Sequence, residues 1–338
     1  MDACEHASAR IGTAFSGPCA GKKLPPMSDV VVITGGSAGV GRAVAQRFAR
    51  RGARVGLLAR GEERLEAAVS EVEKAGGTAL AVRTDVADAA AVDAAAERIE
   101  RELGPIDIWI NNAMATIFAP FHEIEPDEYR RATETTYLGT VWGTLAALRR
   151  MRPRDRGTIV FVGSALAYRG IPLQAPYCGA KHAIKGFFES LRTELLHDRS
   201  AIRTTMVQLP AHNTPQFSWG RTKMPRHPQP VPPIFEPEVA AEAIEYAALH
   251  APRQLLVGWP TVKVVAGNAI APRLVDRYLA RNGYDAQQTP NPVDDERPDN
   301  LFAPAPGDFA SHGVFDRDAK RSSALLRARL ALGRLAPG

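Results

Sequence analysis

This chain of 338 residues has few cysteines, few long apolar runs and no strong net charge of one sign. The three cysteines, Cys4, Cys19 and Cys178, have no paired spacing and form no cluster with histidine. This pattern excludes a disulfide framework and contains no metal-ligand motif, so we expect a reduced compartment and no bound metal.

The apolar runs all fall short of the roughly 20 residues that a membrane-spanning helix needs. The N-terminus carries Asp2 and Glu5 where a secretory signal would have an apolar segment. The net charge of +5 is modest and the arginines are scattered, which argues against a nucleic-acid partner. We therefore expect a cytoplasmic protein without a membrane partner. The alternative is association with a membrane surface through residues 319–332, where arginines accompany leucines.

Composition divides the chain into three parts. Residues 1–27 match neither a structural element nor a targeting peptide, and we expect a disordered leader, with Met27 as an alternative start. Residues 28–283 have the pattern of one domain, large enough to bury a full core. After Gly283 the residues Pro, Asp, Gly and Ala dominate, which predicts a poorly ordered tail over residues 284–338.

Strands and helices alternate at short spacing through this domain. We expect strands over residues 30–33, 53–59, 78–83, 106–110, 158–162, 202–208 and 254–257. We expect helices over residues 42–51, 62–74, 88–103, 126–151, 175–197, 238–249 and 262–279, with Pro272 dividing the last of them. A Pro-rich loop covers residues 210–235. The alternation predicts an α/β fold, a Rossmann-like doubly wound parallel sheet.

A glycine-rich loop joins the first strand to the first helix. Glycine lets the backbone adopt positive φ, and a helix N-terminus offers free N–H groups to a pyrophosphate. A tight turn is the alternative, but the strand and helix on either side favour phosphate binding. The residues expected to bind it are Thr34, Gly35, Ser37, Ala38, Gly39, Val40 and Gly41.

The end of the second strand bears on the choice of cofactor. Dinucleotide folds often carry Asp or Glu here to bind the ribose 2′-hydroxyl of NAD, whereas this chain has Ala59-Arg60. A guanidinium can pair with a 2′-phosphate. Arg60 therefore favours NADP (NADPH), with NAD as the alternative.

A Ser, a Tyr and a Lys form the candidate catalytic set. Tyr177 and Lys181 lie one helical turn apart, and Ser164 ends the fifth strand. A free tyrosine has a pKa of about 10, and a nearby ammonium should lower it toward neutrality. Ser164 can donate a hydrogen bond to an oxygen that gains negative charge.

An apolar pocket beside this set would suit a lipophilic carbonyl or alcohol. The candidate substrate contacts are Met114, Leu166, Ile171, His212, Phe217 and Trp219. The alternative for His212 and Trp219 is a role in loop structure alone.

Taken in order and spacing, these motifs resemble the short-chain dehydrogenase/reductase family, in its shorter branch with a TGxxxGxG loop and a Tyr-x-x-x-Lys pair. The resemblance covers roughly residues 28–260. It implies a homodimer or homotetramer that oxidises or reduces a small-molecule alcohol or carbonyl. It implies that Tyr177 is the acid or base, that Lys181 holds the nicotinamide ribose and that Ser164 binds the substrate oxygen. It adds further cofactor contacts, namely Asp85, Val86, Asn112, Ala113, Pro210 and Thr214.

Three positions depart from the family pattern. Met114 replaces a usual glycine, Thr136 stands where many members have the asparagine of the proton relay, and Ala211 replaces the glycine after Pro210. These departures keep a second hypothesis open, a dinucleotide-binding sensor or scaffold with little turnover.

Overall fold

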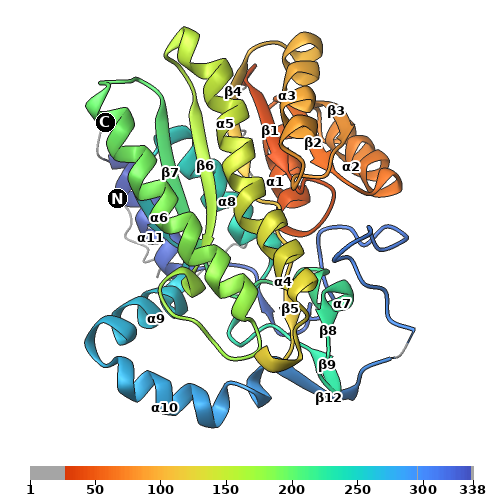
Figure 1. Ribbon diagram of the computed structural model, residues 1–338. Helices are drawn as coiled ribbons and strands as arrows, with labels where there is room; N and C mark the ends of the chain where they lie inside the picture. The colour runs from red at the N-terminus through yellow and green to blue at the C-terminus, as the bar shows by residue number, and fades with distance from the viewer. Residues whose placement is uncertain (1–26, 295, 336–338) are drawn as a thin grey trace, which may run out of the picture.

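The computed structural model describes residues 27–294 and 296–335, and the expected leader, residues 1–26, lies outside this part. Seven parallel strands form one sheet in the order β11-β7-β6-β4-β1-β2-β3 (Figure 1). The strands are β1 Val30–Thr34, β2 Arg54–Ala59, β3 Thr78–Arg83, β4 Ile106–Asn111, β6 Thr158–Ser164, β7 Arg203–Leu209 and β11 Gln254–Leu256. The Rossmann-like doubly wound sheet predicted from the alternation is confirmed.

Helices cover both faces of the sheet. One face is packed by α1 Gly39–Ala49, α2 Glu62–Lys74 and α8 Pro237–His250, and the other by α3 Ala89–Leu103, α5 Gly139–Met151 and α6 Ala175–His197. Figure 1 shows α3, α5 and α6 in front of the sheet and α8 behind it. In β1, Val31 and Ile33 point to the first face, while Val30 and Val32 point to the second. Burial on both faces explains why this strand is a continuous apolar run.

Residues 126–151 form a helical rod with an irregular centre. The rod consists of α4 Pro126–Thr133, a π-helical turn η2 at Glu134–Leu138, and α5. Such turns are rare and occur frequently at functional sites. The helix predicted over this range is present, but the π turn changes which side chains face the interior.

Two further helices leave the layered body. The expected division at Pro272 is present, because α9 Gly258–Ile270 ends before α10 Pro272–Asn282 begins. Both helices project from the lower left of the molecule in Figure 1. Within the described residues, no helix combines the length and apolar character needed to cross a membrane.

The part of the chain after Gly283 differs from the expected poorly ordered tail. Strand β12 Gln288–Pro292 pairs with β9 Arg226–Pro228, and β13 Ala319–Lys320 pairs with β10 Ile234–Phe235. The physical reason is that backbone pairing with the 210–235 loop gives order to a segment whose composition could not form a core alone.

The last helix, α11 Ala324–Leu335, packs against the body. Leu326 and Leu330 are buried in the same core as α1, α2 and α8. The suggested membrane contact through residues 319–332 is therefore wrong, because these leucines already face the protein interior.

The packing of α11 can be tested by truncating one leucine. Leu326 is fully buried, so we expect Leu326→Ala to lower the free energy of unfolding by about 2–4 kcal/mol, through lost burial and a residual cavity. The matched control is Leu332→Ala on the same helix, where the side chain is 66% exposed and the change should stay within about 0.5 kcal/mol. Urea unfolding measures both, and equal values would show that α11 does not pack as described.

Candidate active site

A cavity of about 470 Å³ lies at the carboxyl ends of the parallel strands. The strand order reverses between β1 and β4, and open α/β sheets bind ligands at this switch point. Nearly all residues predicted from the sequence line this one cavity. They are Gly35, Ser37, Ala38, Gly39, Val40, Arg60, Asp85, Val86, Asn112, Ala113, Met114, Ser164, Leu166, Ile171, Tyr177, Lys181, Pro210, His212, Thr214, Phe217 and Trp219.

Thr34 and Gly41 lie beneath the cavity wall instead. The Thr34 hydroxyl accepts hydrogen bonds from the backbone N–H of Asn112 at 3.0 Å and of Ala113 at 3.1 Å. A Cβ at Gly41 would lie 2.2 Å from the carbonyl oxygen of Gly35. These two residues join β1 to β4 and let the loop fold tightly over α1.

The glycine loop has the geometry that a phosphate requires. Gly35 and Gly39 adopt φ of +67° and +55°, and a Cβ at Gly35 would lie 2.9 Å from Ala113 Cα. Helix α1 begins here, and its N-cap residue Ala38 provides no side-chain cap. The Gly39 N–H is bonded to the Ala310 carbonyl, and the next N–H groups of this helix N-terminus suit an anion, so the loop fits a dinucleotide pyrophosphate.

Arg60 lies at the end of β2 and contacts the C-terminal part of the chain. Its guanidinium donates to the backbone carbonyls of Asn300, Leu301 and Phe302. Among the described residues it has no carboxylate partner within 4.0 Å, and burial lowers its pKa. A buried guanidinium bonded only to neutral carbonyls can still accommodate an anion.

The C-terminal segment, residues 299–310, forms one wall of the cavity, with Asn300 and Pro304 in the lining. Arg64 donates to the Ala305 carbonyl at 2.8 Å, and its guanidinium lies 4.8 Å from the Trp219 ring. The Ala310 carbonyl accepts a hydrogen bond from the Gly39 N–H at 3.1 Å. The sequence analysis missed this wall because no periodicity marks it.

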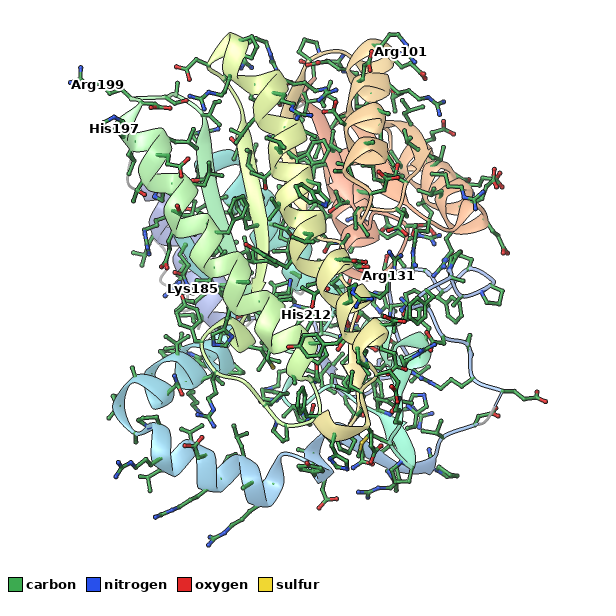
Figure 2. All side chains as sticks on the ribbon, viewed as in Figure 1. Arg101, Arg131, Lys185, His197, Arg199 and His212 are labelled. Carbon is green, nitrogen blue, oxygen red and sulfur yellow. The ribbon has the colours of Figure 1, made fainter. Side chains whose placement is uncertain are left out.

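Asp85 lies beside the same segment. Its carboxylate pairs with Arg131, which also donates to the Leu301 carbonyl at 3.1 Å. Figure 2 shows Arg131 where α4 meets the C-terminal segment. Asp85 therefore lines the cavity with one side of its carboxylate already bonded.

Ser164, Tyr177 and Lys181 come together where β6 ends and α6 begins. The Ser164 hydroxyl accepts the Leu166 N–H at 3.1 Å and is hydrogen-bonded to Tyr177. Lys181 is buried, and its Nζ donates to the Val162 carbonyl at 2.7 Å, 5.5 Å from the centre of the Tyr177 ring.

Burial controls the protonation of this set. It raises the pKa of Tyr177 to about 12, against an opposing contribution from the hydrogen bond with Ser164. It lowers the pKa of Lys181 to about 8. The sequence predicted a lowered pKa for Tyr177, whereas burial of the phenol raises it. Near neutral pH the pair is a neutral phenol and a charged lysine.

The π turn determines which threonine faces the cavity. Thr136 is fully buried, and its hydroxyl bonds to the backbone of Ala115 while its carbonyl accepts from Thr140. Thr135 lines the cavity instead, with a buried hydroxyl that has no partner among the described residues. Thr136, which stands at the family's proton-relay position, is therefore not the threonine at the cavity wall.

His212 lies in the cavity wall beyond β7 (Figure 2). Its Nδ1 donates to the Pro210 carbonyl at 2.9 Å, and burial lowers its pKa to about 4, so the imidazole is neutral. Four glutamines that the sequence analysis missed also line the cavity, namely Gln174, Gln216, Gln229 and Gln287. Gln174 Nε2 donates to Gln287 Oε1 at 2.7 Å, which ties the loop before α6 to the C-terminal part of the chain.

Comparison with known proteins agrees with this geometry. The family model described as short chain dehydrogenase matches residues 29–223. The chain is 32% identical over 304 residues to the uncharacterized oxidoreductase YxnA of Bacillus subtilis (strain 168), covering 88% of this chain and 83% of that protein. It is 34% identical over 193 residues to 3-dehydrosphinganine reductase of Danio rerio, covering 56% of this chain and 58% of that protein.

A solved structure is also similar, the alcohol dehydrogenase from the archaeon Thermococcus sibiricus complexed with 5-hydroxy-NADP. The TM-score is 0.59 at 25% identity, covering 68% of this chain and 96% of that one. The family model spans more than half of the chain. The residues that it matches include the glycine loop, Ser164, Tyr177 and Lys181. The protein therefore belongs to the short-chain dehydrogenase family of oxidoreductases.

Proposed function

We propose that this protein is an NADP-dependent oxidoreductase that interconverts a carbonyl and an alcohol on a lipophilic substrate. The observation that carries the proposal is the meeting of Ser164, Tyr177 and Lys181 in the cavity that the glycine loop also lines. The nicotinamide, when bound, supplies or accepts the hydride.

The protein's own residues handle the proton and the developing charge. In the reducing direction the Tyr177 phenol gives its proton to the carbonyl oxygen, and its raised pKa keeps that proton available at neutral pH. The Ser164 hydroxyl donates a hydrogen bond to the same oxygen. Lys181 holds the nicotinamide ribose, as the resemblance implies, and its charge favours the phenolate that remains.

Two guanidinium groups support NADP over NAD. Arg60 lines the cavity without a carboxylate partner among the described residues. Arg64 also lines the cavity and donates to the backbone carbonyl of Ala305. At the end of β2, where NAD-binding folds often have Asp or Glu, this chain has Ala59 and Arg60. The similar archaeal enzyme is complexed with 5-hydroxy-NADP.

Apolar side chains support a lipophilic substrate. The cavity is lined by Met114, Leu166, Ile171, Phe217 and Val264. A relative of this chain carries the name 3-dehydrosphinganine reductase, a lipid-processing activity.

We further propose that the protein is cytoplasmic and forms a homodimer or homotetramer.

A sensor or scaffold with little turnover is the second candidate. It is favoured by Met114 near the nicotinamide side and by Thr136, which is buried away from the cavity. Cofactor binding without turnover on any carbonyl or alcohol would support it and overturn the enzyme.

Removing the phenol hydroxyl tests the acid. We expect Tyr177→Phe to lower kcat/KM for ketone reduction by about a hundredfold or more, because no group is left to give the proton. NADPH affinity, read by fluorescence, should change little. The matched control is Tyr168→Phe, since the Tyr168 hydroxyl bonds to Gln254 and is not part of the cavity lining. Undiminished turnover in Tyr177→Phe would refute the assigned role.

Removing the guanidinium tests the cofactor choice. We expect Arg60→Ala to weaken NADPH binding by about tenfold or more, since a charge-assisted hydrogen bond is lost, and to weaken NADH binding much less. Isothermal titration measures both. Exposed Arg83→Ala is the control. An equal loss for both cofactors would assign Arg60 to holding the C-terminal segment and not to the 2′-phosphate.

The pH profile tests the lysine. Burial lowers the pKa of Lys181 to about 8, so its charge is complete below that pH and is lost above it. We therefore expect kcat/KM for reduction to be flat near neutral pH and to fall as pH rises through about 8. A profile that stays flat to about pH 10 would contradict the assignment.

A further inference from the structure

The helical pair α9 and α10 packs loosely against the body. In α9 only Gly258 and Thr261 are buried, and in α10 no residue is. Figure 1 shows α10 projecting below the sheet and its covering layers, whereas α9 contacts β7 and α11. Most side chains of α10 are therefore exposed, whereas α9 is partly covered by the body.

Large apolar side chains are exposed on this pair. The exposed fractions are 82% for Ile270, 63% for Leu274, 65% for Tyr278 and 57% for Trp259. Such a concentration within some twenty residues of chain is the usual sign of a binding surface. Trp and Tyr are the aromatic residues that favour the boundary between water and lipid.

Unpaired cations lie among these apolar residues. Arg273, Arg277 and Arg281 recur at every fourth residue of α10, on one face of the helix, and Lys263 lies on α9. None of the four has an ion-pair partner in the parts of the chain that the structure describes. The single carboxylate of the two helices, Asp276, is already paired with Arg169.

The same helices border the cavity. Val264 of α9 and Tyr278, Leu279 and Asn282 of α10 are among its lining residues. A ligand held against the outer surface of the pair would therefore lie next to the cavity opening.

We propose that α9 and α10 dock the protein on the surface of an anionic phospholipid bilayer, next to the cavity opening. Ile270 and Leu274 enter the boundary between headgroups and acyl chains, while Arg273 and Arg277 bind lipid phosphates. The docking itself does not require turnover. It extends the proposed function by giving a lipophilic substrate a route from the bilayer to the cavity.

A second copy of the chain fits this surface less well. A twofold contact presents the same patch on both partners, and this patch offers the arginines no free carboxylate, because Asp276 is already paired with Arg169. An anionic bilayer matches the charge of the patch.

Vesicle flotation of the full chain tests the proposal. We expect binding to vesicles of phosphatidylcholine with about one third phosphatidylserine, and much weaker binding to phosphatidylcholine alone. Arg273→Glu/Arg277→Glu should weaken that binding at least tenfold, and so should Ile270→Ser/Leu274→Ser. Higher salt should weaken the binding of the wild type, because screening acts on the arginine contribution.

Matched variants elsewhere on the surface serve as controls. Arg101→Glu/Arg199→Glu makes the same charge change at the end of the molecule opposite α10 (Figure 2). Leu196→Ser/Leu332→Ser removes leucines that are 64% and 66% exposed. Both controls should bind like the wild type, and circular dichroism confirms that each variant is folded.

Three results would overturn the proposal. The first is a wild type that does not float with anionic vesicles. The second is an equal loss in the control variants, which would mean general charge attraction. The third is a wild type that forms an oligomer and does not bind vesicles, and whose oligomer dissociates on Ile270→Ser/Leu274→Ser. The surface would then be a contact between copies of the chain.

Turnover separates this proposal from the proposed function. The variants Arg273→Glu/Arg277→Glu and Ile270→Ser/Leu274→Ser should reduce a water-soluble ketone at the wild-type rate without vesicles. A wild type that binds vesicles but shows no turnover would overturn the enzyme and leave the docking intact. A wild type that shows full turnover but does not bind vesicles would overturn the docking and leave the enzyme intact.

Discussion

The junction between the ends of β1 and β4 is the contact on which the site depends. One hydroxyl, that of Thr34, accepts two backbone N–H groups from the start of the next loop, and Asn112 Nδ2 donates back to the Thr34 and Gly35 carbonyls. The two loops diverge from this point to either side of the sheet. The cavity is the space between them. Because Gly41 has no Cβ to meet the Gly35 carbonyl, α1 can begin directly beneath the cavity.

Much of this arrangement follows from local sequence. Strand β3 and helices α2 and α6 have the predicted bounds, because alternating or periodic apolar residues define them. Gly76 and Gly77 separate α2 from β3, and Pro176 lies in the first turn of α6. Parallel strands share one carboxyl edge, so residues that follow different strands converge without any further information. That rule brought Ser164, Tyr177 and the glycine loop to one cavity.

What the sequence could not predict depends on contacts between distant segments. The C-terminal segment is ordered by bonds from Arg60 and Arg64 to carbonyls some 240 residues away, and carbonyls belong to every residue type. The place of Thr135 depends on a π turn that leaves no mark in composition. The raised pKa of Tyr177 is a balance of burial against the hydrogen bond with Ser164, which a helical spacing alone does not determine.

The wall formed by the C-terminal segment also has a consequence for biosynthesis. The glycine loop and Arg60 leave the ribosome early, whereas Asn300, Pro304 and Ala310 are among the last residues of the described chain to be made. A nascent chain can therefore complete its central strands while this side of the cavity is still open. The last wall of the cavity is in place only after translation has passed Ala310, whose carbonyl bonds to the glycine loop.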